Sequence, residues 1–284
     1  RVIDADTECI GLSVGLIDRD LGTNIVARAA RANAVYGCDD FMRRIGSGDD
    51  VPTRVYARYW HGYAALARPL LSVMPYNDLR GALLTACCGL LSLLAWRFGR
   101  DFGALSGVAV AAPFVVLNFM GVMVVATKAA TLLVAFGGAL YLQRRRSTEP
   151  PALVFFALGA LTAFFDFLTA PAFVGSLALI VHCAYSARAG APVNWGQAVS
   201  LGAFFALGWC GLILAKFVLA DLTLGQGAFA ESMAAASYRL RGDSAEIESL
   251  LPGAAILANL EALKSYWLPA ALAGFVIAPL VRPA

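Results

Sequence analysis

The residues that could do chemistry gather first in one short run, Arg58-Tyr59-Trp60-His61-Gly62-Tyr63, with Arg68 and Arg80 close behind. Aromatic faces suit sugar rings, and the planar fork of arginine suits phosphate. The alternative is an aromatic belt that only floats a helix at the membrane surface. A purely structural belt needs neither the histidine nor the paired arginines. The run therefore predicts a ligand site formed by Arg58, Tyr59, Trp60, His61, Arg68 and Arg80.

Two carboxylates near the start of the sequence, Asp4 and Glu8, are four residues apart. On a helix they would share one face. Such a pair could hold a divalent metal ion such as Mg²⁺ or Mn²⁺, or one member could act as a general base. Acidic residues also suit the positive end of any helix dipole, and from spacing alone that reading is favoured.

Three more ionisable residues stand out in the apolar part of the chain. Asp166 lies in Phe165-Asp166-Phe167, Lys216 follows a long apolar run, and Arg239 lies in a more polar loop at 221–265. Ionisable groups at membrane depth are costly and usually face a bundle interior or a wet cavity. We therefore expect Asp166 and Lys216 to contact substrate, whereas a solvated amphipathic face is favoured for Arg239, which lies in the outer loop.

The elements that position these residues must be membrane helices. Of the 284 residues, 60% are hydrophobic and only 14% are charged, whereas soluble domains have roughly 25% charged residues. With 22 basic and 19 acidic residues, the chain has no basic face for nucleic acid. We expect residues 1–80 to form a polar, helix-rich stretch, and residues 81–284 to form a transmembrane helix bundle.

Span length divides the bundle, because a helix needs roughly 20 apolar residues to cross a bilayer. This predicts single spans near 81–96, 198–220 and 266–281. Two longer ranges are each divided into two spans: 103–142, with the two helices meeting near 123–128, and 152–186, with the break at Pro171. The total is about seven spans. Arginines in the short loops then fall on one side, which should be cytoplasmic. Residues 1–80 and 221–265 should lie outside. The sequence starts at Arg1 and ends directly after an apolar run, so we expect a fragment.

Within the outer stretch, helices are expected at about 23–36 and at Thr53–Leu66, the second stopping before Pro69. Its aromatic residues at three- and four-residue spacings, with arginines elsewhere on its circumference, are typical of an interfacial helix. Cys9 and Cys38 both lie in this stretch and could pair if it is outside the cytoplasm.

Several of these runs resemble a group of bacterial polytopic membrane proteins that look like GT-C type glycosyltransferases. They are the run from Tyr56 to Tyr63 with its continuation to Arg80, the phrase Phe165–Thr169, the pair Ala215-Lys216, and the opening Ile3–Glu8. The resemblance implies an all-α, GT-C-like fold in the bacterial cytoplasmic (inner) membrane. It also implies sugar transfer from a polyprenyl-phosphate donor on the extracytoplasmic face.

The resemblance further assigns roles to residues. Asp4 or Glu8 would be the catalytic base or metal ligand, and Lys216, with Arg239 or Arg58, would hold the donor phosphate. The acceptor would be a glycan, lipid or protein. Two other functions stay open from the sequence: a transporter or flippase using Asp166 and Lys216, and a non-catalytic lipid-binding protein. The sequence contains no internal repeat of the kind that transporters show.

Overall fold

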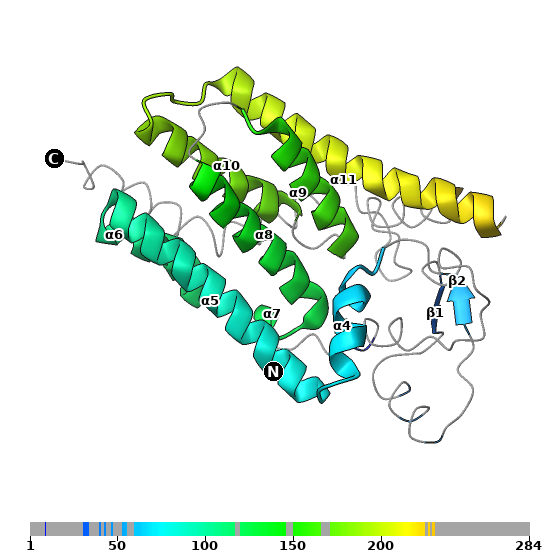
Figure 1. Cartoon of the computed structure of the whole chain (residues 1–284). Helices are drawn as coiled ribbons and strands as arrows, with labels where there is room; N and C mark the ends of the chain where they lie inside the picture. Colours follow the sequence, from blue (N-terminus) through cyan, green and yellow to red (C-terminus); the bar gives the residue numbers. More distant parts are fainter. Residues whose placement is uncertain are drawn as a thin grey trace, which may run out of the picture. The chain divides into compact units, whose positions relative to one another are not determined.

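The computed structural model describes residues 9, 31–33, 40, 43, 47, 53–55, 60–116, 120–145, 150–165, 171–224, 227 and 229–230. This part of the chain is predominantly helical, as predicted, and its elements belong to one compact unit of residues 1–226. The elements are β1 (Arg31–Asn33), β2 (Thr53–Val55), α4 (Tyr63–Leu71), α5 (Tyr76–Phe102), α6 (Ala104–Val116), α7 (Met120–Met123), α8 (Ala126–Arg145), α9 (Ala152–Phe165), α10 (Pro171–Arg188) and α11 (Trp195–Leu224) (Figure 1).

Two predicted helix breaks are confirmed. A helix ends at Met123 and the next begins at Ala126, inside the expected 123–128 region. Likewise, α9 ends at Phe165 and α10 begins with Pro171, where proline fits a first helical turn because its missing amide hydrogen needs no partner there. Before the first break, the structure gives α6 (Ala104–Val116) and the short helix α7 (Met120–Met123), and residues 117–119 between them lie outside the described residues.

Among the described residues, two helices are long and apolar enough to cross a membrane by length and composition, Tyr76–Phe102 and the residues Trp195–Leu222 of α11. Both α6 and α9 are apolar but shorter. The span expected at 266–281 lies outside the described residues.

Two helices predicted for the first 80 residues are wrong where the structure describes them. Residues 31–33 and 53–55 are strands that pair antiparallel, with Arg31 opposite Val55 and Asn33 opposite Thr53. β-Branched Thr53 and Val55 suit a strand, and pairing with a distant segment outweighs the local helical pattern. Helix α4 begins only at Tyr63, and it continues through Pro69 instead of stopping before it.

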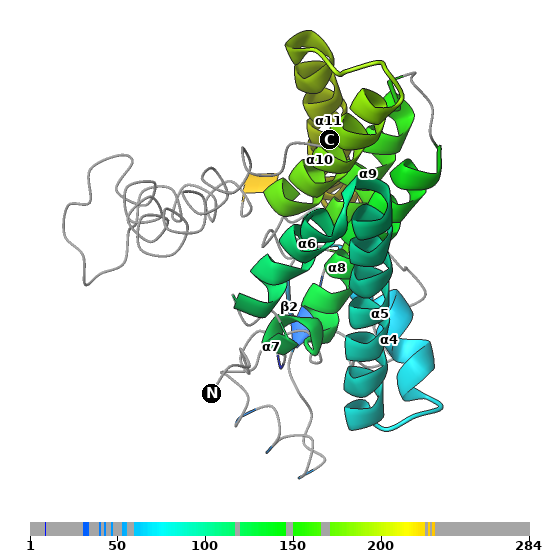
Figure 2. The same ribbon diagram turned by 90° about the vertical axis from the view of Figure 1, so that its left-hand side faces the viewer.

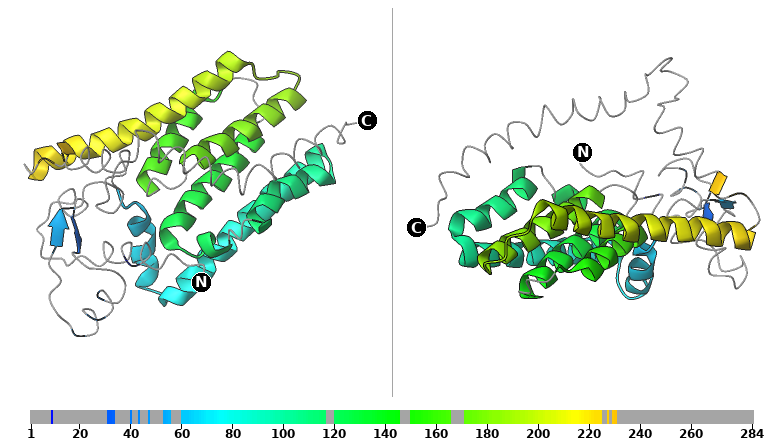
Figure 3. Two further views of the ribbon diagram at one scale, coloured as in Figure 1. Left: turned by 180° about the vertical axis from the view of Figure 1, so that it is seen from behind. Right: turned by 90° about the horizontal axis from the view of Figure 1, so that it is seen from above.

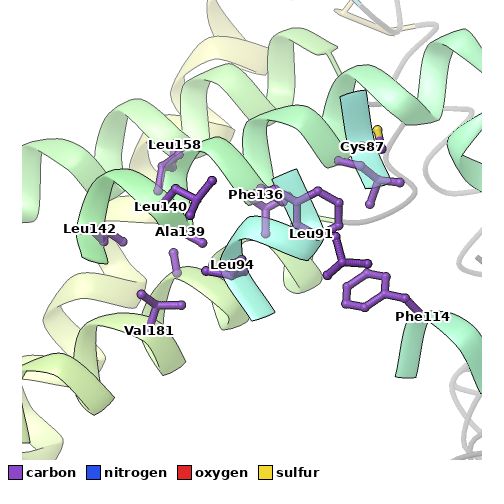
Figure 4. Close-up of a cluster of buried hydrophobic side chains, with 14 of the residues drawn as sticks. Cys87, Leu91, Leu94, Phe114, Phe136, Ala139, Leu140, Leu142, Leu158 and Val181 are labelled. Carbon is purple, nitrogen blue, oxygen red and sulfur yellow. The ribbon is translucent and has the colours of Figure 1, made fainter. Parts of the chain in front are cut away.

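The core of the bundle surrounds α8, which packs against α5, α9 and α10. Most of its residues are buried, which explains why apolar and small side chains occur around its whole circumference. Figure 4 shows the side chains that meet there: Cys87, Leu91 and Leu94 of α5, Phe114 of α6, Phe136, Ala139, Leu140 and Leu142 of α8, Leu158 of α9 and Val181 of α10. Figure 2 shows α6 lying beside α5.

Helices α5 and α8 run parallel. The Cys87 thiol approaches the Ala129 carbonyl oxygen at 3.8 Å, and further along both helices Asp101 and Gln143 hydrogen-bond to the same Tyr185 hydroxyl. These three helices α5, α8 and α10 therefore end together. We call this the Asp101 end, and the opposite end, where α8 begins and α9 finishes, the Lys216 end.

Helices α9 and α11 lie side by side (Figure 3), and at their contact the two backbones approach each other at glycines. A methyl group added at Gly159 would lie 2.0 Å from the Phe205 carbonyl oxygen, and one added at Gly208 would lie 2.0 Å from the Phe156 carbonyl oxygen. Such close backbone approach through small residues is typical of helix pairs in membranes. The two glycines therefore fix α9 against α11.

Candidate functional site

The segment Trp60–Gly62, just before α4, joins the last turn of α9 to the interior of α11. The indole N–H of Trp60 donates to the Leu212 carbonyl oxygen of α11 at 2.8 Å. The backbone N–H of Gly62 donates to the Phe164 carbonyl oxygen in the last turn of α9 at 2.9 Å. One bond thus satisfies a carbonyl that the end of α9 leaves open, and together they anchor the segment to both helices.

The Trp60 ring brings a buried cation and an aromatic face together. The Lys216 amino group lies 5.7 Å from the centroid of the Trp60 ring, and Lys216 is only 3% exposed. The ring of Phe164 lies on Trp60 as well, with centroids 6.2 Å apart and planes tilted by 42°. At this distance the ammonium is attracted by the ring quadrupole, by about 2 kcal/mol when the pair is desolvated.

His61 and Gly62 give the segment its shape. His61 is 5% exposed, has a positive φ of 55°, and packs edge-on against the Tyr63 ring at 6.1 Å. A left-handed backbone is uncommon outside glycine, although histidine is enriched among the exceptions, and here it lies directly before Gly62 and the start of α4 at Tyr63. At Gly62 an added methyl group would lie 2.2 Å from a Phe164 ring carbon, so only glycine lets the backbone approach α9.

The structure therefore brings together residues from three of the predicted motifs. Trp60 and His61 come from the run Tyr56–Tyr63. Phe164 directly precedes the phrase Phe165–Thr169, and Lys216 comes from the pair Ala215-Lys216.

Two other predicted residues lie in α4 and α5, on either side of the turn that joins these helices. Arg68 is exposed in the last turn of α4, and the Arg80 guanidinium lies 5.9 Å from the Tyr76 ring centroid in the first turn of α5. The remaining predicted site residues lie outside the described residues: Asp4, Glu8, Arg58, Tyr59, Asp166 and Arg239.

The metal prediction concerns two of those residues, Asp4 and Glu8. Within the part of the chain that the structure describes, no group of three or more histidine, cysteine or acidic side chains could hold a metal ion.

Cys9 is disulfide-bonded, whereas Cys87, Cys183 and Cys210 in the helices have free thiols. The free thiols in apolar helices agree with the sequence, where those cysteines are interpreted as small apolar residues, whereas the sequence leaves open whether Cys9 is bonded.

Sequence reasoning missed a partly buried polar cluster at the Asp101 end. The Tyr185 hydroxyl donates to Asp101 at 2.8 Å and accepts from the Gln143 amide, and Arg100 donates to Asp101 at 3.1 Å. The Gln143 side-chain oxygen has no hydrogen-bond partner among the described residues. Nearby, the Arg188 guanidinium lies 5.4 Å from the Phe102 ring centroid. The sequence does hold a signal for this cluster. Asp101, Gln143 and Tyr185 are polar residues that each lie near one end of an apolar segment, and these three ends fall on the same side of the bundle.

At the Lys216 end, the arrangement suits an anion that also presents a flat or ring-shaped group. A buried ammonium attracts a phosphate strongly because water does not screen it, and the Trp60 face offers apolar contact beside it. The Asp101 end differs, since its carboxylate already accepts hydrogen bonds from Tyr185 and Arg100.

No protein-family model matches the sequence, and no curated protein or solved structure shows significant similarity to the chain. The resemblance to GT-C type glycosyltransferases thus stands on the short sequence motifs alone.

Proposed function

We propose that this protein is a membrane glycosyltransferase of GT-C type that transfers a sugar from a polyprenyl-phosphate donor to an acceptor outside the membrane. The observation that carries the proposal is the convergence of Trp60, the end of α9 and buried Lys216 at one end of the helix bundle. A donor phosphate would lie against Lys216, with the sugar beside Trp60.

Membrane insertion is supported by α5 and α11, which have the length and composition of spans. The proposed arrangement has about seven spans, with each crossing needing roughly 20 residues, so the shorter helices α6 and α9 would cross only with their flanking residues. Arg100, Arg144, Arg145 and Arg188 lie in the last turns of their helices at the Asp101 end, which favours that end as cytoplasmic.

The outer location of residues 1–80 is supported by the disulfide bond of Cys9, since disulfides persist in oxidising compartments and are rare in the cytosol. Under this topology the Lys216 end faces the outside of a bacterial cytoplasmic membrane.

In the proposed reaction, Asp4 or Glu8 accepts the proton of the acceptor hydroxyl. The hydroxyl oxygen forms a bond to the anomeric carbon while the bond from that carbon to the phosphate oxygen breaks. The electron pair of the broken bond leaves with the lipid phosphate, so negative charge grows there. A cation already in place at Lys216 would lower the barrier, because its position requires no reorganisation during the reaction.

The lipid chain of the donor also has a suitable surface. An open groove of about 520 Å³ lies between α8 and α9, lined almost entirely by apolar residues and two glycines: Leu133, Val134, Gly137, Gly138, Tyr141, Leu153, Val154, Ala157, Leu158 and Leu161. An isoprenoid chain would gain hydrophobic contact there beside the bilayer.

The test is sugar transfer by the full chain in liposomes supplied with radiolabelled polyprenyl-phosphate sugars and a mixture of acceptors. Wild-type protein should transfer label, and Lys216→Met should reduce transfer at least tenfold, while the matched control Lys128→Met on α8 should keep it. Asp4→Asn and Glu8→Gln identify the base. If both of these variants, folded and membrane-inserted, kept full activity, the proposed catalytic assignment would be wrong.

A second candidate is a transporter or flippase. The observation in its favour is that buried polar groups occupy both ends of the bundle, Lys216 at one and Gln143 and Tyr185, bonded to the half-buried Asp101, at the other. In the same liposomes, movement of labelled lipid across the bilayer without any transfer to acceptor would support this alternative.

A further inference from the structure

Two hydroxyl groups of α8 are buried and lack any hydrogen-bond partner in the part of the chain that the structure describes. They belong to Thr127, 3% exposed, and Thr131, 2% exposed. A helical threonine normally bonds to the carbonyl one turn before it, as Thr162 does to Leu158 at 2.7 Å and Thr85 to Gly81 at 2.8 Å. Thr131 does not bond to the Thr127 carbonyl one turn before it, and Thr127, as the second residue of α8, has no preceding turn in that helix, so neither hydroxyl has a partner within α8.

The two threonines share one side of α8, because they are four residues apart. Gly138, two turns after Thr131, also lies on that side, and its Cβ position approaches the Leu158 side chain of α9. The hydroxyls therefore lie on the side of α8 that faces α9, opposite the side on which Ala129 meets α5.

Along the axis of the bundle, the Thr127 and Thr131 hydroxyls lie at the same height as the candidate site. Helices α8 and α9 are consecutive and antiparallel, with Gly138 beside Leu158. From there to Thr131, and equally from Leu158 to Phe165, each helix advances about 10 Å at 1.5 Å per residue. Thr131 is therefore level with the last turn of α9, where Phe164 accepts the hydrogen bond from Gly62. Helix α4, which follows Gly62, also packs against α8.

An unpaired buried hydroxyl costs about 1–3 kcal/mol, and valine at either position would have nearly the same shape without that cost. The missing partner should therefore be a ligand. A hydroxyl both donates and accepts, so two of them one turn apart match neighbouring hydroxyl groups of a sugar. An isoprenoid chain would leave them unpaired, and a phosphate is better matched by the ammonium of Lys216.

We infer that Thr127 and Thr131 bind hydroxyl groups of the sugar whose phosphate lies against Lys216. This extends the proposed function, on which it rests, by separating two parts of one site: α8 recognises the sugar, and α11 holds the anion.

The experiment measures binding of two short probes to the full chain in lipid nanodiscs by ligand-detected NMR titration. Hexyl β-D-glucoside carries a sugar without phosphate, and hexyl phosphate carries phosphate without sugar. The variants are Thr127→Val/Thr131→Val, the conservative Thr127→Ser/Thr131→Ser, Lys216→Met, and the control Thr162→Val, whose hydroxyl is satisfied within its own helix.

The double valine variant should bind the glucoside about tenfold more weakly, as expected for two lost hydrogen bonds, and should bind hexyl phosphate like the wild type. The double serine variant should retain glucoside binding, and Thr162→Val should change neither affinity. The melting temperature of the double valine variant should equal or exceed that of the wild type, whereas a purely structural role would lower it.

Two results overturn the inference: wild-type protein that does not bind the glucoside, or glucoside binding that survives in the double valine variant. The proposed function has its own readout, since Lys216→Met should weaken only hexyl phosphate. If hexyl phosphate fails to bind while glucoside binding depends on the threonines, the phosphate assignment is wrong and the threonine assignment stands.

Discussion

The Lys216 ammonium lies 5.7 Å from the centroid of the Trp60 ring, and the N–H of that ring is bonded to the Leu212 carbonyl one turn earlier on α11. Trp60 thus contacts α11 at two successive turns. Because the Trp60 indole contacts α11 both at Leu212 and at Lys216, its aromatic face stays beside the Lys216 ammonium. Substitutions of Trp60 therefore test this arrangement.

Replacing Trp60 with alanine removes this contact together with the Phe164 ring contact. We expect a loss of about 3 kcal/mol in the free energy of unfolding, as for other aromatic truncations. Trp60→Phe keeps an aromatic face and loses the hydrogen bond to Leu212, for about 1 kcal/mol. Thermal unfolding in detergent checks both values. Equal stability of the two variants would contradict a specific role for the ring.

The close approach of Gly62 to Phe164 predicts a strong response to one methyl group. Gly62→Ala should displace the Phe164 ring, weaken the backbone hydrogen bond and cost about 2 kcal/mol through overpacking. Gly81 in α5 is a matched control, since its Cβ position has no neighbour within 4 Å, and Gly81→Ala should stabilise by about 0.5–1 kcal/mol. Chemical unfolding curves of the two variants should therefore shift in opposite directions.

The contact between α9 and α11 should be equally intolerant. Gly208→Ala places a methyl group against the Phe156 carbonyl and should cost about 3 kcal/mol, because backbone cannot move aside as a side chain can. Gly202→Ala lies on the same helix with open space around it and should be tolerated. Melting temperatures measured in one detergent compare the pair; similar losses for both would refute the tight helix contact.

The cluster at the Asp101 end predicts a stability effect without a binding effect. Tyr185→Phe removes the donor to Asp101 and the acceptor for Gln143, so it should cost about 2 kcal/mol. Tyr141→Phe is the control, since Tyr141 is 54% exposed. Hexyl phosphate binding at the Lys216 end should stay unchanged in Tyr185→Phe. A loss of binding comparable to that of Lys216→Met would instead show that the two ends are coupled.

The proposed topology predicts the accessibility of two thiols. In a background with Cys87, Cys88, Cys183 and Cys210 replaced by alanine, an impermeant maleimide should label Cys9 from the outside of intact cells only after reduction. A cysteine introduced by Arg144→Cys should react only in inverted vesicles. Mass spectrometry reads both labels. Labelling of Cys9 from the cytoplasmic side would reverse the orientation.

The sequence anticipates the apolar helices well, because burial in a bundle or bilayer leaves a direct record in composition. The break at Pro171 and the one between Met123 and Ala126 follow from span length and from proline chemistry. From the sequence, Trp60 and Lys216 are both expected to bind the ligand, but not to contact each other. Their contact depends on how α9 packs on α11.

The errors have a different physical origin. The β-pair joins segments about twenty residues apart, so no local pattern reveals it. The aromatic spacing predicts a helix through His61, but His61 has a left-handed backbone and the next residue, Gly62, is hydrogen-bonded to α9, a tertiary contact that spacing does not reveal. The Asp101 cluster was missed because each member is an ordinary polar residue at the end of an apolar helix, and only parallel packing brings them together.

The glycine contact between α9 and α11 has a consequence for how a ligand could enter. At Gly159 and Gly208 the backbones of α9 and α11 are in direct contact. No side chain lies there that could rotate to open a passage between the two helices. The segment Trp60–Gly62 is hydrogen-bonded to both of these helices. We therefore expect a ligand to reach buried Lys216 by displacing Trp60–Gly62 from α9 and α11 while those two helices stay packed together.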